Sequence, residues 1–295
     1  MAIQPSQLEI DNIVAASGLR LSNPTVPASG TDTGTQGDIS WDSNYLYVCT
    51  SGDTWKRAAM STWLDLPVST NVELWLDAND SSTITLNGST VSQWDDKSGN
   101  NYHISQATAS NQPAYVTSVL NSKNIVRFDG VNDIMSNASA QPVAGSASRT
   151  IFYVFSCNTT FTGWQYEYGL YFGLASPVDG GVIAISQELA VRVSNGYRIF
   201  NQSNDDGSHA IISAVQDGTN VSNYSMWKNG SALSATTTLS RALNIGAGIH
   251  LGAHANNTTN WLDGDIAEVI VYSSALSTSD RESVESYLSD KWGIT

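Results

Sequence analysis

The sequence predicts an all-β protein: a two-sheet jelly-roll sandwich with one C-terminal helix, preceded by a small β-meander. From Thr62 onward, short segments that alternate apolar and polar residues are separated by turn signals, a pattern typical of sandwiches. The dipeptides Asn195-Gly196 and Asn229-Gly230 are the strongest of these signals, because both favour the tight turns of hairpins.

The chain is expected to divide into three regions. Residues 1–37 are interpreted as an N-terminal arm and linker, because residues 23–37 are rich in Pro, Gly, Ser and Thr. Residues 38–61 are expected to form the meander, and residues 62–295 the sandwich. The candidate strands of the sandwich alternate apolar and polar residues and are 72–76, 125–128, 150–156, 168–174, 182–186, 190–193, 197–201, 209–215, 224–228, 250–253 and 265–272.

Aromatic residues characterise the meander. Trp41, Tyr45 and Tyr47 recur at period-two spacing, and Trp55 follows a turn cluster. A meander of this size is too small to be stable alone, so it must pack on the sandwich or on copies of itself. We therefore expect Trp41, Tyr45, Tyr47 and Trp55 to anchor the chain or to form an oligomer contact.

A short amphipathic helix is expected after the last strand. Ser277 and Asp280 form an approximate capping box, with Asp in place of Glu, and Gly293 closes the helix. One helical face carries the apolar residues Val284, Tyr287, Leu288 and Trp292.

Several segments resemble the laminin-G-like branch of the concanavalin A-like lectin/glucanase superfamily. They occur in the family's order between residues 63 and 295. The segments are LWLDAND (74–80), VSQWDDKSGN (91–100), VRFDGVND (126–133), YSMWKNG (224–230) and DGDIAEVIVY (263–272). The resemblance implies a concanavalin A-like jelly roll, but it says little about function because one fold hosts many functions.

The meander has a resemblance of its own. The segment from Gly37 to about Trp63, with GDI-x-WDS-x-YLYVC followed by TWKR, is similar to a short module of bacteriophage tail-fibre and other virion proteins, notably of phages that infect marine cyanobacteria. This resemblance implies a virion setting.

The overall charge excludes some classes of partner. The formal net charge is −14, from 13 basic and 27 acidic residues, which disfavours nucleic acid and anionic membrane surfaces. We expect no membrane-spanning helix and no secretory signal, because neither a long apolar run nor a basic start is present. Cys49 and Cys157 are expected to be buried thiols rather than a disulfide.

Three carboxylates at Asp263, Asp265 and Glu268 raise the question of catalysis. Retaining β-glucanases of the same superfamily carry E-x-D-x-x-E on a strand, with two carboxylates about 5 Å apart. Here the first residue is Asp, one methylene shorter, and the strand leads into the C-terminal helix, which is the wrong place in the chain. We therefore expect no enzyme activity and no catalytic residues.

A calcium site is a further expectation. Carboxylate and amide side chains crowd the predicted loops, and oxygen-rich loops can hold Ca²⁺. Laminin-G-like domains often bind Ca²⁺ at the sandwich rim, so the resemblance implies Asp95, Asp96 and Asp133 as candidate ligands. The alternative is that these side chains cap turns.

Aromatic residues near polar loops predict a glycan-binding site. Trp164 and Tyr166 end an aromatic run, and Trp261 follows the polar loop 256–260. Sugar rings stack on aromatic faces while Asp and Asn side chains bind the hydroxyls. The alternative is that the same aromatics are core or interface anchors.

Together these observations predict a non-enzymatic bacteriophage virion protein, either a capsid decoration or a fibre-like appendage. It would display a lectin-like domain for surface glycans and be made in the host cytoplasm without a signal peptide. Its partners would be other virion proteins and further copies of itself, with a trimer expected. The alternatives are a stand-alone glycan-binding lectin and a glycoside hydrolase.

Overall fold

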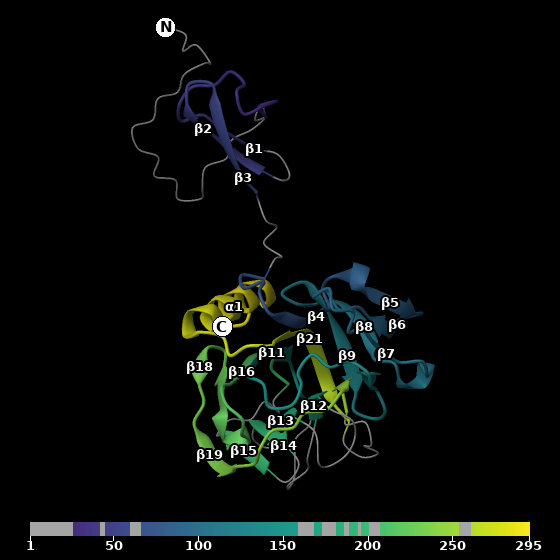
Figure 1. Ribbon diagram of the computed structural model, residues 1–295. Coiled ribbons are helices and arrows are strands. Elements are labelled where there is room, and N and C mark those ends of the chain that lie inside the picture. The colour runs from purple at the N-terminus through teal and green to yellow at the C-terminus, as the bar shows by residue number, and fades with distance from the viewer. Residues whose placement is uncertain are drawn as a thin grey trace. The chain divides into compact units, whose positions relative to one another are not determined.

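The computed structural model describes residues 26–41, 45–59, 66–158, 168–172, 181–185, 189–193, 196–200, 207–253 and 261–295 (Figure 1). The chain forms two compact units, Met1–Asp65 and Leu66–Thr295. Each unit is described by itself. No helix in the described ranges is long and apolar enough to cross a membrane.

The first unit contains a three-stranded antiparallel sheet in the order β1-β2-β3. Its strands are β1 (Ile39–Trp41), β2 (Tyr45–Ser51) and β3 (Thr54–Ala59). This is the meander that the sequence predicts. The tight turn between β2 and β3 places Asp53 at a φ of 53°, a left-handed conformation that Asp tolerates better than most residues.

Residues 26–37 are part of this first unit rather than a linker, which corrects the sequence prediction. The backbone N–H of Trp55 donates to the carbonyl of Gly30 at 2.9 Å, and that of Asp53 to the carbonyl of Gly34 at 3.0 Å. The indole Nε1 of Trp55 donates to the carbonyl of Asp32 at 3.1 Å. The Pro- and Gly-rich composition therefore builds a hydrogen-bonded loop that covers one side of β3.

The second unit is a sandwich of two antiparallel sheets. One sheet begins with the strands β18 (Ser231–Ala232), β17 (Tyr224–Lys228), β16 (Ala210–Gln216), β11 (Arg149–Phe155) and β21 (Asp263–Tyr272), in that order. On its other edge, β21 pairs with two strands, β4 (Val72–Asp77) and β9 (Lys123–Asp129). The sheet ends with β8 (Ala114–Leu120), which pairs with β9.

The other sheet runs in the order β5 (Ile84–Asn87), β6 (Thr90–Trp94), β7 (Ile104–Ser105), β10 (Met135–Asn137), β20 (Ile249–Leu251), β12 (Tyr168–Phe172), β13 (Gly181–Ile185), β14 (Leu189–Val193), β15 (Gly196–Phe200) and β19 (Ala235–Leu239). The pair Thr90–Ala114 joins the two sheets at one edge. Short 3-10 turns occur at Ser81–Thr83, Ala109–Asn111 and Val221–Asn223.

The strand β11 explains how the core is layered. Every residue from Arg149 to Phe155 is buried, because β11 is covered on both faces. Ile151, Tyr153 and Phe155 belong to the core between the sheets, whereas Phe152 and Val154 belong to a second apolar cluster beneath the helix. A strand buried on both faces has a continuous apolar sequence rather than an alternating one.

The C-terminal helix α1 (Thr278–Trp292) packs on the outer face of the β11 sheet (Figure 1). The predicted cap is confirmed: the Ser277 hydroxyl accepts a hydrogen bond from the Asp280 N–H at 3.2 Å. Gly293 closes the helix at a φ of 67°. The predicted face is also confirmed, since Val284, Leu288 and Trp292 are fully buried and Tyr287 packs beside them.

Both cysteines are buried, Cys49 in the first unit and Cys157 in the second, and in the described ranges no disulfide joins them. Their burial is as expected, and their being thiols in the protein stays a prediction.

Candidate functional site

Three segments meet at one end of the sandwich and form what we call the rim: the turn 129–133 after β9, Asn158 after β11, and residues 261–263 at the start of β21. The Gly130 N–H donates to the carbonyl of Leu262 at 2.9 Å, and the Asn158 N–H to the carbonyl of Asp263 at 2.8 Å. The Asn158 amide also donates to the Asp263 carboxylate at 3.1 Å. The rim therefore gathers polar side chains that lie far apart in the sequence.

The turn 129–133 is shaped by its own side chains. The Asp129 carboxylate accepts hydrogen bonds from the N–H groups of Val131 at 2.8 Å and Asn132 at 3.2 Å. Gly130 has a φ of +74°, and a Cβ there would lie 2.8 Å from the Cβ of Asp263. Gly130 is thus required locally, because only glycine suits this conformation at this close approach.

Asp133 is the most perturbed acid of the rim. It is 6% exposed, and its carboxylate accepts a hydrogen bond from the Asp129 N–H at 2.9 Å. Burial, assisted by the nearby charge of Asp129, raises the pKa of Asp133 to about 6. Beside it, the buried Oδ1 of Asn132 accepts no hydrogen bond from the described chain. The rim therefore holds an acid that titrates at mildly acidic pH and an unused acceptor.

Trp261 borders this turn. It is half-buried and forms an isolated bridge with Ala253, while the next N–H, that of Leu262, donates to the carbonyl of Gly252 at 2.7 Å. The other two residues predicted to bind glycan, Trp164 and Tyr166, lie outside the described residues. The rim segments therefore carry an aromatic residue as well as carboxylate and amide groups, a combination suited to a hydroxylated ligand.

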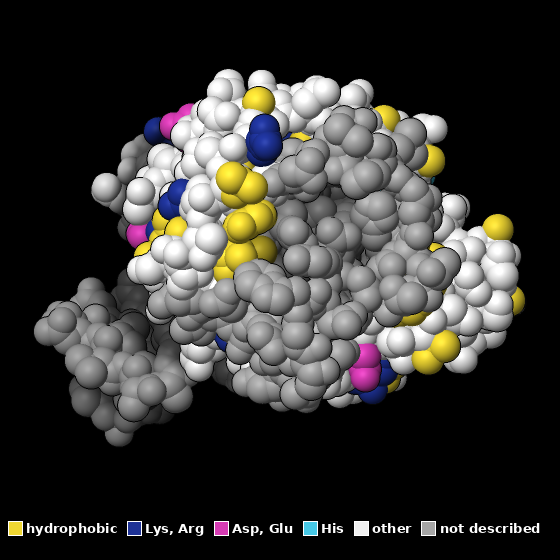
Figure 2. Space-filling view, turned by 90° about the horizontal axis from the view of Figure 1, so that it is seen from below, with side chains coloured by type: hydrophobic (Ala, Val, Ile, Leu, Met, Phe, Trp, Pro, Cys, Tyr) yellow, Lys and Arg dark blue, Asp and Glu magenta, His cyan; other side chains and the backbone are white. Residues whose placement is uncertain are grey.

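Figure 2 shows few charged side chains among the described residues of this face, and a band of hydrophobic atoms together with smaller hydrophobic patches. This agrees with the low charged content of the chain, 14%.

The acids of the suspected catalytic motif have separate partners. Asp265 forms a bidentate pair with Arg127, at 2.7 and 2.9 Å, and lies 3.2 Å from His209 Nε2. Burial by itself would raise the pKa of Asp265, but the hydrogen bonds from Arg127 and His209 outweigh it and lower the pKa. Asp263 binds Asn158 at the rim.

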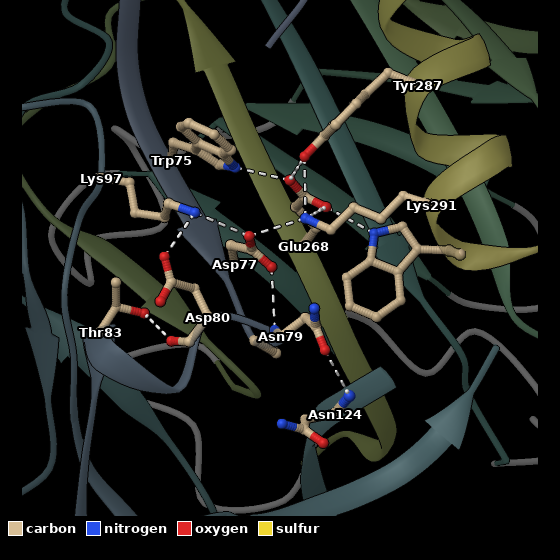
Figure 3. A network of polar contacts seen from close by, with 12 residues as sticks. Trp75, Asp77, Asn79, Asp80, Thr83, Lys97, Asn124, Glu268, Tyr287 and Lys291 are labelled. Atoms are coloured by element: carbon tan, nitrogen blue, oxygen red, sulfur yellow. Dashed lines mark hydrogen bonds and ion pairs between the residues drawn. The ribbon is translucent and has the colours of Figure 1, made fainter. Parts of the chain in front are cut away.

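Glu268, the third acid, is fully buried between β21 and α1 (Figure 3). Its carboxylate accepts hydrogen bonds from the indoles of Trp75 and Trp292, both at 2.7 Å, and from the Tyr287 hydroxyl at 3.1 Å. Lys291 Nζ lies 2.7 Å from it. A register shift in the pairing of β21 with β11 between Val154 and Phe155 marks a bulge beside Glu268.

The network around Glu268 continues to β4 and its neighbourhood in the second unit, as a row of side chains whose charges alternate in sign (Figure 3). Lys291 lies 2.9 Å from Asp77, and Lys97 bridges Asp77 at 3.0 Å and Asp80 at 2.8 Å. Burial raises the pKa of Glu268, and Lys291 opposes that effect. Because protein donors surround the buried carboxylate, we assign this network to holding α1 on the sheet rather than to chemistry.

The three candidate calcium ligands do not form one site. Asp96 accepts hydrogen bonds from the N–H groups of Trp75, Ser98 and Tyr102, at 2.9, 2.9 and 3.0 Å. It therefore orders its own loop and holds that loop against β4. Asp95 binds Gln93 at 2.7 Å, and Asp133 belongs to the rim. Across the described ranges no cluster of three or more acidic, His or Cys side chains could hold a metal ion. Calcium binding by the chain stays a prediction.

Of the four predicted anchor residues of the first unit, Trp41, Tyr47 and Trp55 are divided between the two faces of its sheet. Trp41 pairs with Leu46 and Ser40 with Tyr47, so Trp41 and Tyr47 point to opposite faces. Tyr47 and Trp55 line a groove of about 400 Å³ beside the loop 27–30, together with Lys56 and Arg57. The side chain of Tyr45 lies outside the described residues.

Comparison with known proteins finds no matching family model. A segment in the N-terminal part of the chain is similar to two phage proteins. Over 39 residues it is 46% identical to a capsule K30/K69-specific depolymerase of Klebsiella phage K64-1, and over 37 residues 54% identical to depolymerase 1, capsule K30/K69-specific, of Klebsiella phage K5-2. The matches cover 13% and 12% of this chain but 5% of each relative.

The sandwich is similar in fold to domain 4 of AbnA, a GH43 extracellular arabinanase from Geobacillus stearothermophilus, solved in complex with arabinotriose. The TM-score is 0.50 at 14% identity, over 74% of this chain and 98% of that domain. At this identity the likeness shows the β-sandwich fold alone. The narrower assignment to the laminin-G-like branch stays a prediction.

Sequence reasoning missed how the rim is assembled. It named Asp133 as a metal ligand and Trp261 as a sugar platform, but it did not connect them. Asn158 was not among the predicted site residues, since an Asn after a strand has no sequence signal for such a role. Only the pairing of β9 with β21, which sets Asp129 opposite Asp263, brings these residues together.

Proposed function

We propose that this chain is a non-enzymatic phage virion protein whose first unit attaches it to the particle and whose sandwich binds surface glycans through the rim. The observation that carries the proposal is the short N-terminal similarity to two phage depolymerases, which covers 5% of each. A short segment shared by otherwise dissimilar proteins is best explained by a shared attachment role. Capsule polysaccharide is the ligand class that those relatives suggest.

The rim supports the glycan-binding half of the proposal. Trp261 is half-buried and lies two residues before Asp263, which pairs with Asp129 across the rim. These groups can stack on a sugar ring and bind its hydroxyls. Capsule oligosaccharides and host-surface glycans are the ligands to test.

The absence of catalysis is likewise proposed from the partners of the acids. Asp265 is held by Arg127 and Glu268 is sealed beneath α1, so neither is poised as a nucleophile or as a general acid. A purified chain that releases reducing ends from capsule polysaccharide would contradict this part and favour a glycoside hydrolase.

A glycan array on the full chain tests the proposal, with and without Ca²⁺. We expect selective binding that Trp261→Ala reduces at least tenfold, whereas Trp227→Ala, a matched tryptophan on β17, leaves it unchanged. Binding lost on chelation would support the calcium expectation. If the wild-type chain binds no glycan on the array, or if both variants bind equally, the rim is not the binding site.

The attachment half includes self-association, for which we propose a homotrimer. It is supported by the small size of the first unit, since a meander of this kind is rarely stable alone. Cryo-electron microscopy of particles carrying the labelled chain would locate it on the capsid or the tail, and its absence from particles would contradict a virion role.

A further inference from the structure

Lys291 places its amine between two buried carboxylates of the second unit (Figure 3). Its Nζ lies 2.9 Å from Asp77 Oδ2 and 2.7 Å from Glu268 Oε2. The side chain of Lys291 is 4% exposed, that of Asp77 2% and that of Glu268 0%. Burial beneath α1 keeps these groups from any outside substrate, but it also holds an amine, a carboxyl group and a second acid in contact with one another.

We propose that Lys291 and Asp77 join in an amide (isopeptide) bond within the chain, with Glu268 as the catalytic residue that carries the proton. The Lys291 ammonium first gives a proton to the Asp77 carboxylate. The neutral amine then attacks Cγ of Asp77, a C–N bond forms, a C–O bond breaks and one water leaves. Glu268 takes the proton that the attacking nitrogen loses and delivers it to the departing hydroxyl, so its carboxylate is regenerated.

Burial of the pair favours this reaction. Two opposite charges lose their hydration in an apolar site, so the proton transfer that neutralises both is less costly there than in water. Burial also raises the pKa of Glu268, against the opposing effect of Lys291, which makes the carboxylate a better proton acceptor. The reaction needs no reactant besides the chain and occurs once, so it adds no enzyme activity.

Asp77 is placed to be the group that is attacked. Its Oδ1 accepts a hydrogen bond from the Asn79 N–H at 3.0 Å, and its Oδ2 lies 3.0 Å from Lys97 Nζ. These donors can stabilise the negative charge that develops on the carboxyl oxygens as the amine adds. Burial would lower the pKa of Lys97, but Asp77 and Asp80 outweigh it and raise the pKa. Lys97 therefore stays an ammonium and does not compete as the nucleophile.

The bond would connect the two ends of the sandwich in the chain, because Asp77 ends β4 and Lys291 lies in the last turn of α1. It would serve the same end as the ion pairs, since both hold α1 on the sheet. A cross-link that closes so long a loop also restricts the unfolded chain strongly.

The first experiment is mass spectrometry of the purified full chain after trypsin digestion. Trypsin does not cleave after an acylated lysine, so the bond should give one branched peptide in which residues 58–97 are joined to residues 282–295. Its mass should be lower by one water than the sum of the two peptides, and fragmentation should place the link on Asp77 and Lys291. Finding only the separate peptides 58–97 and 282–291, or a link through another lysine, would overturn the proposal.

Variants of the three groups test the chemistry. Asp77→Asn should still form the link but should lose one ammonia in place of one water, because the leaving group is then the amide nitrogen. Lys291→Arg should give no link, because the guanidinium keeps its charge. Lys123→Arg, at the start of β9, is the matched control and should link as wild type does.

Glu268→Gln should slow linking at least about a hundredfold, the usual contribution of a positioned acid–base group. The time course is followed after refolding from urea, and far-UV circular dichroism shows that the variant has folded. A folded Glu268→Gln that links at the wild-type rate would overturn the role of Glu268. If this variant does not fold, the ammonia loss of Asp77→Asn and the wild-type branched peptide decide the proposal.

Discussion

The indole Nε1 of Trp292, the last residue of α1, donates a 2.7 Å hydrogen bond to the fully buried carboxylate of Glu268 on β21. This contact fixes the C-terminal end of α1 to β21, the strand that precedes the helix in the chain. Because Lys291 neutralises the same carboxylate and also reaches Asp77, the helix is bound by charge as well as by apolar packing.

Replacing Lys291 by Met should destabilise the sandwich by about 3–5 kcal/mol, the usual consequence of leaving a buried charge without its partner. The measurement is the free energy of urea unfolding. Lys123→Met, at the start of β9, is the control and should change it by less than about 0.5 kcal/mol. The double variant Glu268→Gln with Lys291→Met should recover part of the loss. Equal, small effects of Lys291→Met and Lys123→Met would show that the network contributes little.

Asp133 should make the stability of the sandwich depend on pH in the mildly acidic range. Its pKa in the folded protein is about 6, above the ordinary value of 3.8, so the folded state binds the proton more tightly. The resulting stabilisation is present in full below about pH 4 and is lost as the pH rises through 6. Asp133→Asn should remove this dependence, and the difference in unfolding free energy between wild type and variant, followed from pH 4 to 7, is the measurement. A constant difference would contradict the assignment.

Gly264→Ala should prevent stable folding or cost more than about 3 kcal/mol, because overpacking against rigid backbone cannot relax. The added Cβ would lie 2.1 Å from the Ser156 carbonyl oxygen. Gly246→Ala is the control, since nothing lies within 4 Å of its added Cβ. Urea midpoints compare the two, and a soluble Gly264→Ala with a wild-type midpoint would mean that β11 and β21 lie further apart.

Ser277→Ala should cost about 1 kcal/mol by removing the helix cap. Ser286→Ala, at an exposed position within the same helix, should be neutral or slightly stabilising. Thermal unfolding of both variants decides this. An unchanged midpoint for Ser277→Ala would show that α1 is held by its docking contacts alone.

Local patterns were sufficient for much of the architecture. The helix was predictable because its cap, its apolar face and Gly293 lie within a span of 17 residues, from Ser277 to Gly293. Strands such as β9, β17 and β21 were predictable for the same reason, since apolar patterning and Asn-Gly signals act over neighbouring residues, whereas β5 to β8, β10, β18 and β19 were not among the predicted strands. The loop 26–37 was predicted to be a linker because its composition resembles one. Its hydrogen bonds instead join it to Asp53 and Trp55, which follow β2 in the chain.

By itself the sequence determined the all-β class, the terminal helix, the meander and the acidic balance of the chain, all of which depend on residue type and short-range spacing. Only the tertiary structure decided that Glu268 is sealed, that Asp129 meets Asp263 at the rim, and that Trp41 and Trp55 face opposite ways. These depend on strand register, and a register is set by partners distant in the chain, where a shift of one residue turns a side chain to the other face.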